Sequence, residues 1–251
     1  IINPCNYVFI FDKTQYMELS NEGIKTVYYA PLAVNTERLK RMFENEDAVK
    51  SQAYAGDISF IGSMYNEKHN LYDKLNGVND YTKGYLDAIM KAQRSIYGYF
   101  FLEDMLKGDV LDEMLRVCPV KPNKDGVETV QYVYANYFLA RRMATDERTD
   151  IMSRIGRELG VKNKINLYTP DSAVKFINVN NRGTVDYYNE MPYVFRNSRI
   201  NLNITLRSIK SGIPLRCMDV CGAGGFLLSN YQEDLYDVFV PGEDMVIYDS
   251  I

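Results

Sequence analysis

The residue types best suited to chemistry lie in one polar run and in the segment directly after it. The run supplies two cations, a hydroxyl and a glycine, and the next segment supplies a guanidinium and a carboxylate one helical turn apart. These residues are Arg207, Lys210, Ser211, Gly212, Arg216 and Asp219. Cations, hydroxyls and an accessible backbone suit a phosphate group, and a carboxylate suits ribose hydroxyls. The pattern therefore predicts a nucleotide-binding site.

The elements around this run have the order strand, loop, helix, strand. Residues 199–204 alternate between apolar and polar types, which is typical of a strand. Pro214 suits the first position of a helix, because its fixed φ and missing N–H cost nothing there. Glycines at 222–225 end that helix, and residues 226–228 form a short apolar strand. Open α/β sheets bind their ligands in such a loop, where free N–H groups at a helix start suit a phosphate.

A second small-residue turn follows another predicted strand, 57–63 (DISFIGS), and contains Gly62 and Ser63. A turn of this kind lets a phosphate approach the backbone. Most Gly-Ser turns bind nothing, so the motif is weak by itself. It gains weight because the carboxyl ends of parallel strands meet at one edge of a sheet.

The segment SGIPLRCMDVCGAGGFLLSN, residues 211–230, resembles the donor-site motif of GT-B glycosyltransferases. It resembles in particular the subgroup related to spore-maturation proteins of the CgeB type, which FIGSMYNEK (60–68) and FVPGEDMVIYDS (239–250) also match. The resemblance covers roughly residues 57–251 and implies two Rossmann-like domains, with a nucleotide-sugar held against the second. Many retaining members carry two glutamates eight positions apart around this helix. Ser211 and Asp219 occupy those positions here, so the resemblance retains only the ribose-binding acid, in shortened form.

The expected fold class is α/β, with a Rossmann-like parallel sheet that forms the C-terminal half of a GT-B fold. Residues 1–34 would be the tail of an incomplete N-terminal Rossmann-like domain, with strands at 7–11 and 25–29. Residues 35–56 would be a linker helix, and 57–251 the nucleotide-sugar-binding domain. Apolar residues at three- and four-residue steps predict a helical insertion at 79–160. Within it we expect one long helix across 86–105 and a renewed helix from Thr145 to Gly160; further strands are expected at 164–168, 174–179 and 244–248.

Composition narrows the functional classes. The net charge of -4 gives no electrostatic footprint for nucleic acid, and no apolar run approaches the ~18 residues of a membrane span. Four cysteines without metal-type spacing indicate a reducing, cytoplasmic setting. The only histidine, His69, lies in a charged segment, which argues against a histidine-dependent triad. No Asp-x-Asp pair occurs, which disfavours a metal-dependent GT-A enzyme, and we expect neither a metal nor a cofactor.

Three functions remain open. The first is a glycosyltransferase that moves a sugar from a nucleotide-sugar donor to an unknown acceptor, which is a glycan, a protein or a small molecule. The second is a non-catalytic nucleotide-binding module, favoured by Ser211 at a position where an acid is common. The third is a Rossmann oxidoreductase, suggested by GAGG at 222–225, but a dinucleotide fingerprint opens a helix and this motif closes one. Catalytic residues and oligomeric state stay unassigned. Because the resemblance places the acceptor side in the other domain, this chain alone is expected not to transfer sugar.

Overall fold

The computed structural model of the chain describes residues 3–66, 70–121 and 128–250. Lys68, at the end of the 60–68 motif, and His69 lie outside these residues. Two separate sheets are present, one of two strands and one of six, and every strand pair in both is parallel. The chain is thus an α/β protein, as the alternation of strands and helices predicts.

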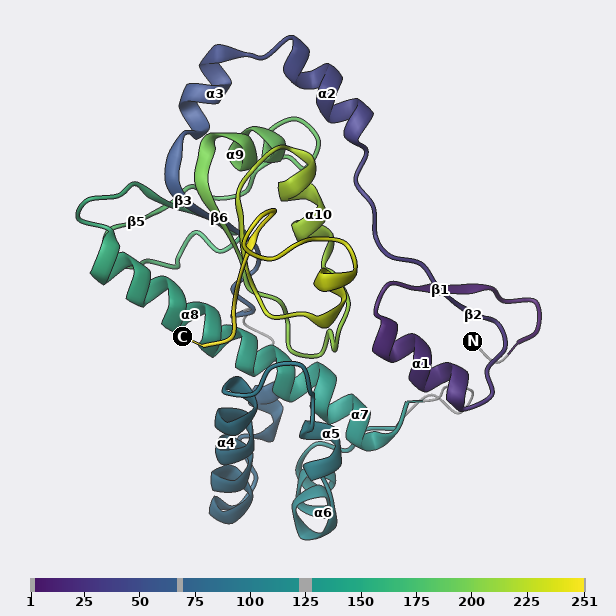
Figure 1. Cartoon of the computed structure of the whole chain (residues 1–251). Coiled ribbons are helices and arrows are strands. Elements are labelled where there is room, and N and C mark those ends of the chain that lie inside the picture. Colours follow the sequence, from purple (N-terminus) through teal and green to yellow (C-terminus); the bar gives the residue numbers. More distant parts are fainter. Residues whose placement is uncertain (1–2, 67–69, 122–127, 251) are drawn as a thin grey trace.

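The six-stranded sheet forms the main body of the molecule (Figure 1). In spatial order its strands are β5 (Val179–Asn181), β4 (Ile165–Tyr168), β3 (Gly56–Ile61), β6 (Ser198–Asn203), β7 (Leu227–Asn230) and β8 (Val246–Tyr248). Counted from β3, this is the order 3-2-1-4-5-6 of Rossmann-like folds. Ile58 of β3 pairs with Ile200 of β6 in parallel, as predicted for neighbouring strands of one sheet.

Helices cover both faces of this sheet, because successive side chains of a strand point to opposite faces. Phe60 of β3 packs in one core with Ile151 and Met152 of helix α8 (Ala140–Leu159). Its neighbour Ile61 packs in a second core with residues of three helices. They are α9 (Met191–Asn197), α10 (Leu215–Gly222) and the first linker helix, α2 (Thr36–Glu44).

The linker contains two helices, where one was predicted. A second helix, α3 (Ala48–Tyr54), begins after Asp47, whose carboxylate accepts hydrogen bonds from the next N–H groups and caps it. Leu39 of α2 is buried in the core of the larger domain, and Tyr54 of α3 packs against the same core. The linker therefore lies on the larger domain.

The insertion between β3 and β4 is helical in its described residues and has a hydrophobic core of its own, which includes Leu86, Met114 and Tyr134. Its elements are η1 (Leu71–Leu75), α4 (Asp80–Arg94), α5 (Leu102–Met105), α6 (Gly108–Val117), α7 (Val130–Val133) and η2, a π-helical turn (Tyr134–Leu139) that leads into α8. In Figure 1 the helices α4, α5 and α6 project from the lower end of the main body.

Two predictions for the insertion are wrong. The long helix expected across 86–105 ends at Arg94, because Gly98 has a φ of 77° that a helix cannot contain. The renewed helix expected at Thr145 does not start there, because the chain is already helical from Val130 through the π-turn into α8.

Smaller differences concern element ends. The strand predicted at 174–179 begins only at Val179, since Asn178 adopts a left-handed φ of 57°. Pro214 is the N-cap of α10, one position before the helix begins. A 3-10 turn, η3 (Glu233–Asp237), follows β7.

The N-terminal residues form a strand–helix–strand unit beside the main body (Figure 1). Its elements are β1 (Val8–Ile10), α1 (Lys13–Asn21) and β2 (Val27–Tyr29). The two strands pair in a sheet of their own, as predicted for this segment. The face of this small sheet that carries Tyr7, Phe9 and Tyr28 is open, with Phe9 69% exposed.

Candidate functional site

The sheet reverses its strand order between β3 and β6, which is where Rossmann-like folds form a ligand crevice. Gly62 and Ser63 follow β3 at this point. Here, however, Arg148 of α8 joins the two strand ends. Its guanidinium donates to the carbonyl oxygen of Ser63 and, at 2.6 Å, to that of Ile204. The side chain is buried against the rings of Phe60 and Tyr65, so it fills the crevice.

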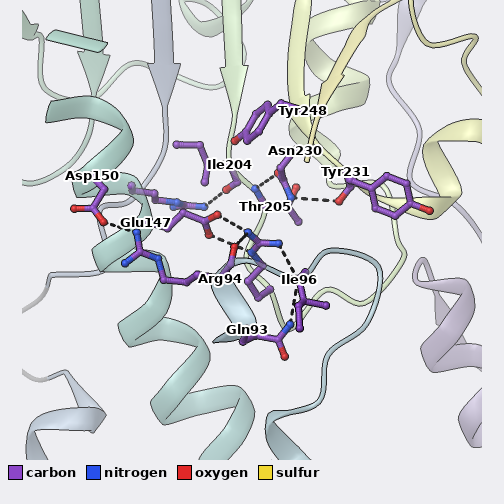
Figure 2. A network of polar contacts seen from close by, with 12 residues as sticks. Gln93, Arg94, Ile96, Glu147, Asp150, Ile204, Thr205, Asn230, Tyr231 and Tyr248 are labelled. Atoms are coloured by element: carbon purple, nitrogen blue, oxygen red, sulfur yellow. Dashed lines mark hydrogen bonds and ion pairs between the residues drawn. The ribbon is translucent and has the colours of Figure 1, made fainter. Parts of the chain in front are cut away.

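A buried ion pair closes the crevice further. Arg207 bonds Glu147 of α8 at 2.7 Å, and neither side chain is more than 6% exposed. The guanidinium also lies 3.6 Å from the ring centre of Tyr97 and donates to the carbonyl oxygen of Arg94 at 3.0 Å. Figure 2 shows this network between Glu147 and the backbone of Arg94 and Ile96. Residues of the helical insertion therefore bind the Arg207 side chain.

Polar side chains continue along the ends of β6 and β7. The amide of Asn203 donates to Thr205 and Ser229 at 2.9 Å each, and the Thr205 N–H donates to the Asn230 side chain at 2.7 Å (Figure 2). Beside them lies a cavity of about 10 Å³, lined in part by Tyr99 and residues of the insertion. That volume holds about one water molecule, whereas small-molecule pockets span roughly 300–1,000 Å³. The crevice is closed to a nucleotide in this arrangement.

The loop before α10 already holds an anionic group. The carboxylate of Asp12 accepts hydrogen bonds from the N–H groups of Lys210 at 2.6 Å and Ser211 at 3.2 Å, and from the Ser211 hydroxyl at 3.2 Å. Gly212 lies so close that a Cβ there would be 2.8 Å from the Asp12 Cα. The Lys210 ammonium pairs with Glu18 at 2.6 Å. The predicted loop thus binds a carboxylate from the N-terminal unit.

Arg216 and Asp219 face α9 and do not pair with each other. Arg216 lies beside the Met191 thioether and 5.4 Å from the ring centre of Phe195, and burial lowers its pKa. Within the described part of the chain, no carboxylate lies within the 4.0 Å ion-pair distance of this guanidinium. Asp219 accepts a hydrogen bond from the Tyr187 hydroxyl at 2.9 Å, and burial raises its pKa.

The eight residues predicted from the sequence therefore fall into three neighbouring groups. Gly62, Ser63 and Arg207 belong to the closed crevice. Lys210, Ser211 and Gly212 contact the N-terminal unit, and Arg216 and Asp219 contact α9 and the loop before it. All three lie at or just beyond the carboxyl edge of the sheet, but no single cavity among the described ones joins them.

Sequence reasoning missed Asp12, Glu147, Arg148 and Tyr187. A signal existed for two of them, because Glu147 and Arg148 interrupt a buried stripe of α8 that is otherwise small or apolar. A charged pair in such a stripe indicates a buried ionic network. Asp12 follows a strand and caps a helix, as many aspartates do, and Tyr187 lies in a loop without a motif.

Metal-binding clusters and membrane-spanning helices are both absent from the described residues. No group of three or more His, Cys, Asp or Glu side chains is arranged to hold a metal ion. No described helix combines the length and the apolar character needed to cross a bilayer.

Burial raises the pKa of the Cys217 thiol to about 12 and that of Cys221 to about 11, so both act as apolar residues of α10.

Fold and site together define a Rossmann-like α/β protein, with a loop at the carboxyl edge of its sheet whose N–H groups bind the Asp12 carboxylate. Residues 148–251 match the model of a family described as glycosyl transferase-like. This segment runs from Arg148 through the loop and α10 to the end of the chain, and the match supports a relationship of this part to glycosyltransferases. No curated protein and no solved structure matches the chain.

Proposed function

We propose that residues 57–251 form the nucleotide-sugar-binding domain of a GT-B glycosyltransferase of the CgeB-like subgroup. The observation that carries this proposal is the binding of a carboxylate by the N–H groups of Lys210 and Ser211, just before α10. Backbone donors that hold one anion are suited to another, and they lie within the segment that resembles glycosyltransferases. The donor diphosphate would lie at this loop and at the start of α10.

The proposed chemistry is electrostatic. The bond between the anomeric carbon and the diphosphate oxygen breaks, the bonding electrons leave with the nucleoside diphosphate, and an acceptor oxygen forms the new glycosidic bond. Fixed donors directed at the growing negative charge lower the barrier without a metal. The N–H groups of Lys210 and Ser211, the dipole of α10 and the Arg216 guanidinium are those donors. The base that takes the acceptor's proton is not identified.

Asp219 is proposed to bind the ribose hydroxyls. Its carboxylate already accepts one hydrogen bond, from Tyr187, and it lies one turn beyond Arg216 on α10. A small cavity between Arg38, Met191 and Asp219 lies beside this carboxylate. Ribose binding there requires the loop around Tyr187 to move, because the cavity is only about 10 Å³.

The test is calorimetric titration with UDP, GDP and ADP in the absence of divalent metal. The Arg216→Ala variant should bind its best nucleotide more weakly by roughly 1.5–3 kcal/mol, since one charge-assisted hydrogen bond is lost. Arg199→Ala is the matched control, because Arg199 pairs with Asp57 at the opposite, amino end of β6. Equal affinities for wild type and the Arg216 variant, with the fold intact, would remove Arg216 from the site.

The ribose contact has its own test. Asp219→Asn should lower the affinity for a ribonucleotide more than the affinity for its 2′-deoxy counterpart, because only the ribonucleotide loses a partner. Equal losses for both nucleotides would assign Asp219 a structural role.

A non-catalytic nucleotide-binding module is the second candidate. It is favoured by Ser211, whose hydroxyl is occupied by Asp12 and by the Thr14 N–H at 3.0 Å. We expect this 251-residue chain alone to bind donor without turnover, since the resemblance to GT-B enzymes places the acceptor side in the N-terminal domain. Release of nucleoside diphosphate from sugar nucleotides would be compared between this chain and a longer form that contains a complete N-terminal domain. Turnover by the longer form alone supports a transferase, and no turnover by either supports a binding module.

A further inference from the structure

Side chains of the N-terminal unit and of the larger domain accept hydrogen bonds from each other's backbone N–H groups. Asp12 is 3% exposed and accepts from the loop, as described above, while also accepting from the Gln15 N–H at 2.9 Å as the N-cap of α1. In the reverse direction, the larger domain caps the same helix. Ser211 accepts from the Thr14 N–H at 3.0 Å, and Asp234 accepts from the Lys13 N–H at 3.1 Å.

The contact supplies acceptors for the backbone donors at the start of α1. The first three N–H groups of α1, which have no partner inside a helix, bond to Asp234, Ser211 and Asp12 in turn. Asp234 is buried at 2% exposure, and burial raises its pKa. We call this reciprocal contact between Asp12–Gln15 and Lys210–Ser211, together with Asp234, the latch.

The Asp12 carboxylate occupies the N–H groups that the donor diphosphate would use. A carboxylate and a phosphate compete for the same kind of site, because both present anionic oxygens to backbone donors. A buried carboxylate held by several donors does not leave unless another anion replaces it or it gains water. Occupation by Asp12 and occupation by a diphosphate are therefore mutually exclusive states of one loop.

We propose that Asp12 is an internal competitor for the donor site, and that nucleoside diphosphate binding releases the latch and frees the N-terminal unit. This rests on the proposed function, because it takes the loop at 210–212 to be the diphosphate site. The apparent affinity for the nucleotide is lowered by the fraction of molecules that are latched. Donor binding is thereby linked to the position of the N-terminal unit.

The test variant is Asp12→Asn. Asparagine is as good an N-cap as aspartate, so α1 keeps its cap while the anion is removed from the loop. Two measurements are made: calorimetric affinity for UDP, GDP and inorganic pyrophosphate, and hydrogen–deuterium exchange of the amides of Lys13, Thr14, Lys210 and Ser211. Glu22→Gln is the control, because Glu22 is an exposed acid at the other end of α1.

Asp12→Asn is expected to raise amide exchange at Lys13 and Thr14 without nucleotide and to tighten nucleotide binding roughly tenfold. In wild type, the nucleotide or pyrophosphate should raise exchange at Lys13 and Thr14 but keep Lys210 and Ser211 protected. Asp234→Ala, which removes the acceptor of the Lys13 N–H and leaves Asp12 charged, should change exchange in the same direction. Glu22→Gln should change neither quantity.

Two outcomes would overturn the proposal, and they are distinguishable. If Asp12→Asn raises exchange but binds nucleotide as well as wild type or more weakly, Asp12 does not compete; the diphosphate site, tested through Arg216, still stands. If neither wild type nor the two variants bind any of the probes, the proposed function fails and the latch proposal fails with it.

Discussion

Arg148 is the residue on which the closed crevice depends most. Its guanidinium joins the carbonyl oxygens at the ends of β3 and β6, which are the two strands that flank the reversal of strand order. Burial lowers its pKa, and no carboxylate bonds to it in the described part of the chain. Neutral carbonyl oxygens and aromatic rings hold this cation instead, which ties α8 to the sheet at the place where a ligand would otherwise enter.

Arg148→Ala should lower the free energy of unfolding by about 3 kcal/mol or more, because two buried carbonyl oxygens lose a charged donor and a cavity remains. Chemical denaturation measures the loss. Arg154→Ala on the same helix is the control, since Arg154 makes only an exposed pair with Glu158, and its effect should stay within about 0.5 kcal/mol. Similar effects for both variants would show that Arg148 does not brace the sheet.

Asp219 is expected to lower stability at neutral pH. Its pKa is raised by burial, so between the unfolded and folded pKa values the folded state binds more protons than the unfolded state. The stability contribution is therefore full below the unfolded pKa of about 3.9 and is lost as pH rises through the folded pKa. Asp219→Asn should raise the free energy of unfolding at pH 7, and this gain should shrink as pH falls through the folded pKa.

Asp57→Asn is a control that should change the free energy of unfolding at pH 7 in the opposite direction. Hydrogen bonds from the Lys164 N–H and from Arg199 lower the pKa of Asp57, so its carboxylate stabilises the folded state above the unfolded pKa. Denaturation midpoints at pH 7 should fall for Asp57→Asn and rise for Asp219→Asn. A fall for both variants would contradict the burial argument for Asp219.

At the scale of elements, the break after α4 brings the insertion to the crevice. The helix ends at Arg94, and the turn at Gly98 directs residues 95–101 against Tyr231 at the end of β7. This turn places the Tyr97 ring against Arg207 and supplies the carbonyl oxygen of Ile96 as an acceptor to its guanidinium. A continuous helix would carry these groups away from Arg207.

Gly98→Ala should destabilise the protein by about 1 kcal/mol or more, because alanine disfavours the positive φ and its Cβ would lie 3.1 Å from the Tyr231 ring. Gly84→Ala is a matched control in α4, where a Cβ meets nothing within 4 Å and alanine is the better helix former. Denaturation should show a gain of roughly 0.5–1 kcal/mol for Gly84→Ala. A gain for Gly98→Ala as well would show that the turn is not required.

Much of the fold follows from sequence, but the state of the site does not. The alternation of strands and helices along the chain is typical of a parallel sheet covered on both faces, so that sheet could be predicted. The end of α4 could not, because apolar spacing continues through 96–105 while a single glycine sets the turn. Asp12 is separated from Ser211 by 199 positions, and no local pattern reports such a contact. Site residues could therefore be chosen by type, but their partners could not.

At the scale of the whole molecule, the linker holds the N-terminal unit to the larger domain along α10. Val34 lies against Gly222 at the end of this helix, where a Cβ would come within 2.6 Å of the valine side chain. The linker helices that follow contribute Leu39 to the core of the larger domain. The N-terminal part of the chain thus contacts the larger domain at two places along α10. One is Gly222 at the end of the helix, and the other is the latch before its start.

Gly222→Ala should destabilise the protein by about 1–3 kcal/mol through overpacking against Val34. Val34→Ala in the same chain should restore part of that loss, because the added methyl group then has space. A double-mutant cycle from thermal or chemical unfolding gives the interaction energy of the pair. Additive effects of the two substitutions would show that the linker does not pack at this point.

The open aromatic face of β1 and β2 has a consequence for the colloidal behaviour of the protein. Tyr7, Phe9 and Tyr28 form one ring cluster, with centroid distances of 6.1 and 5.7 Å, on a parallel sheet of only two strands. Apolar patches on strands with unpaired edges promote self-association. Light scattering by the wild type should therefore rise steeply with protein concentration, and Phe9→Lys should flatten that rise while leaving the unfolding midpoint nearly unchanged. Val49→Lys, which charges a single exposed side chain on α3, should leave the scattering curve of the wild type unaltered.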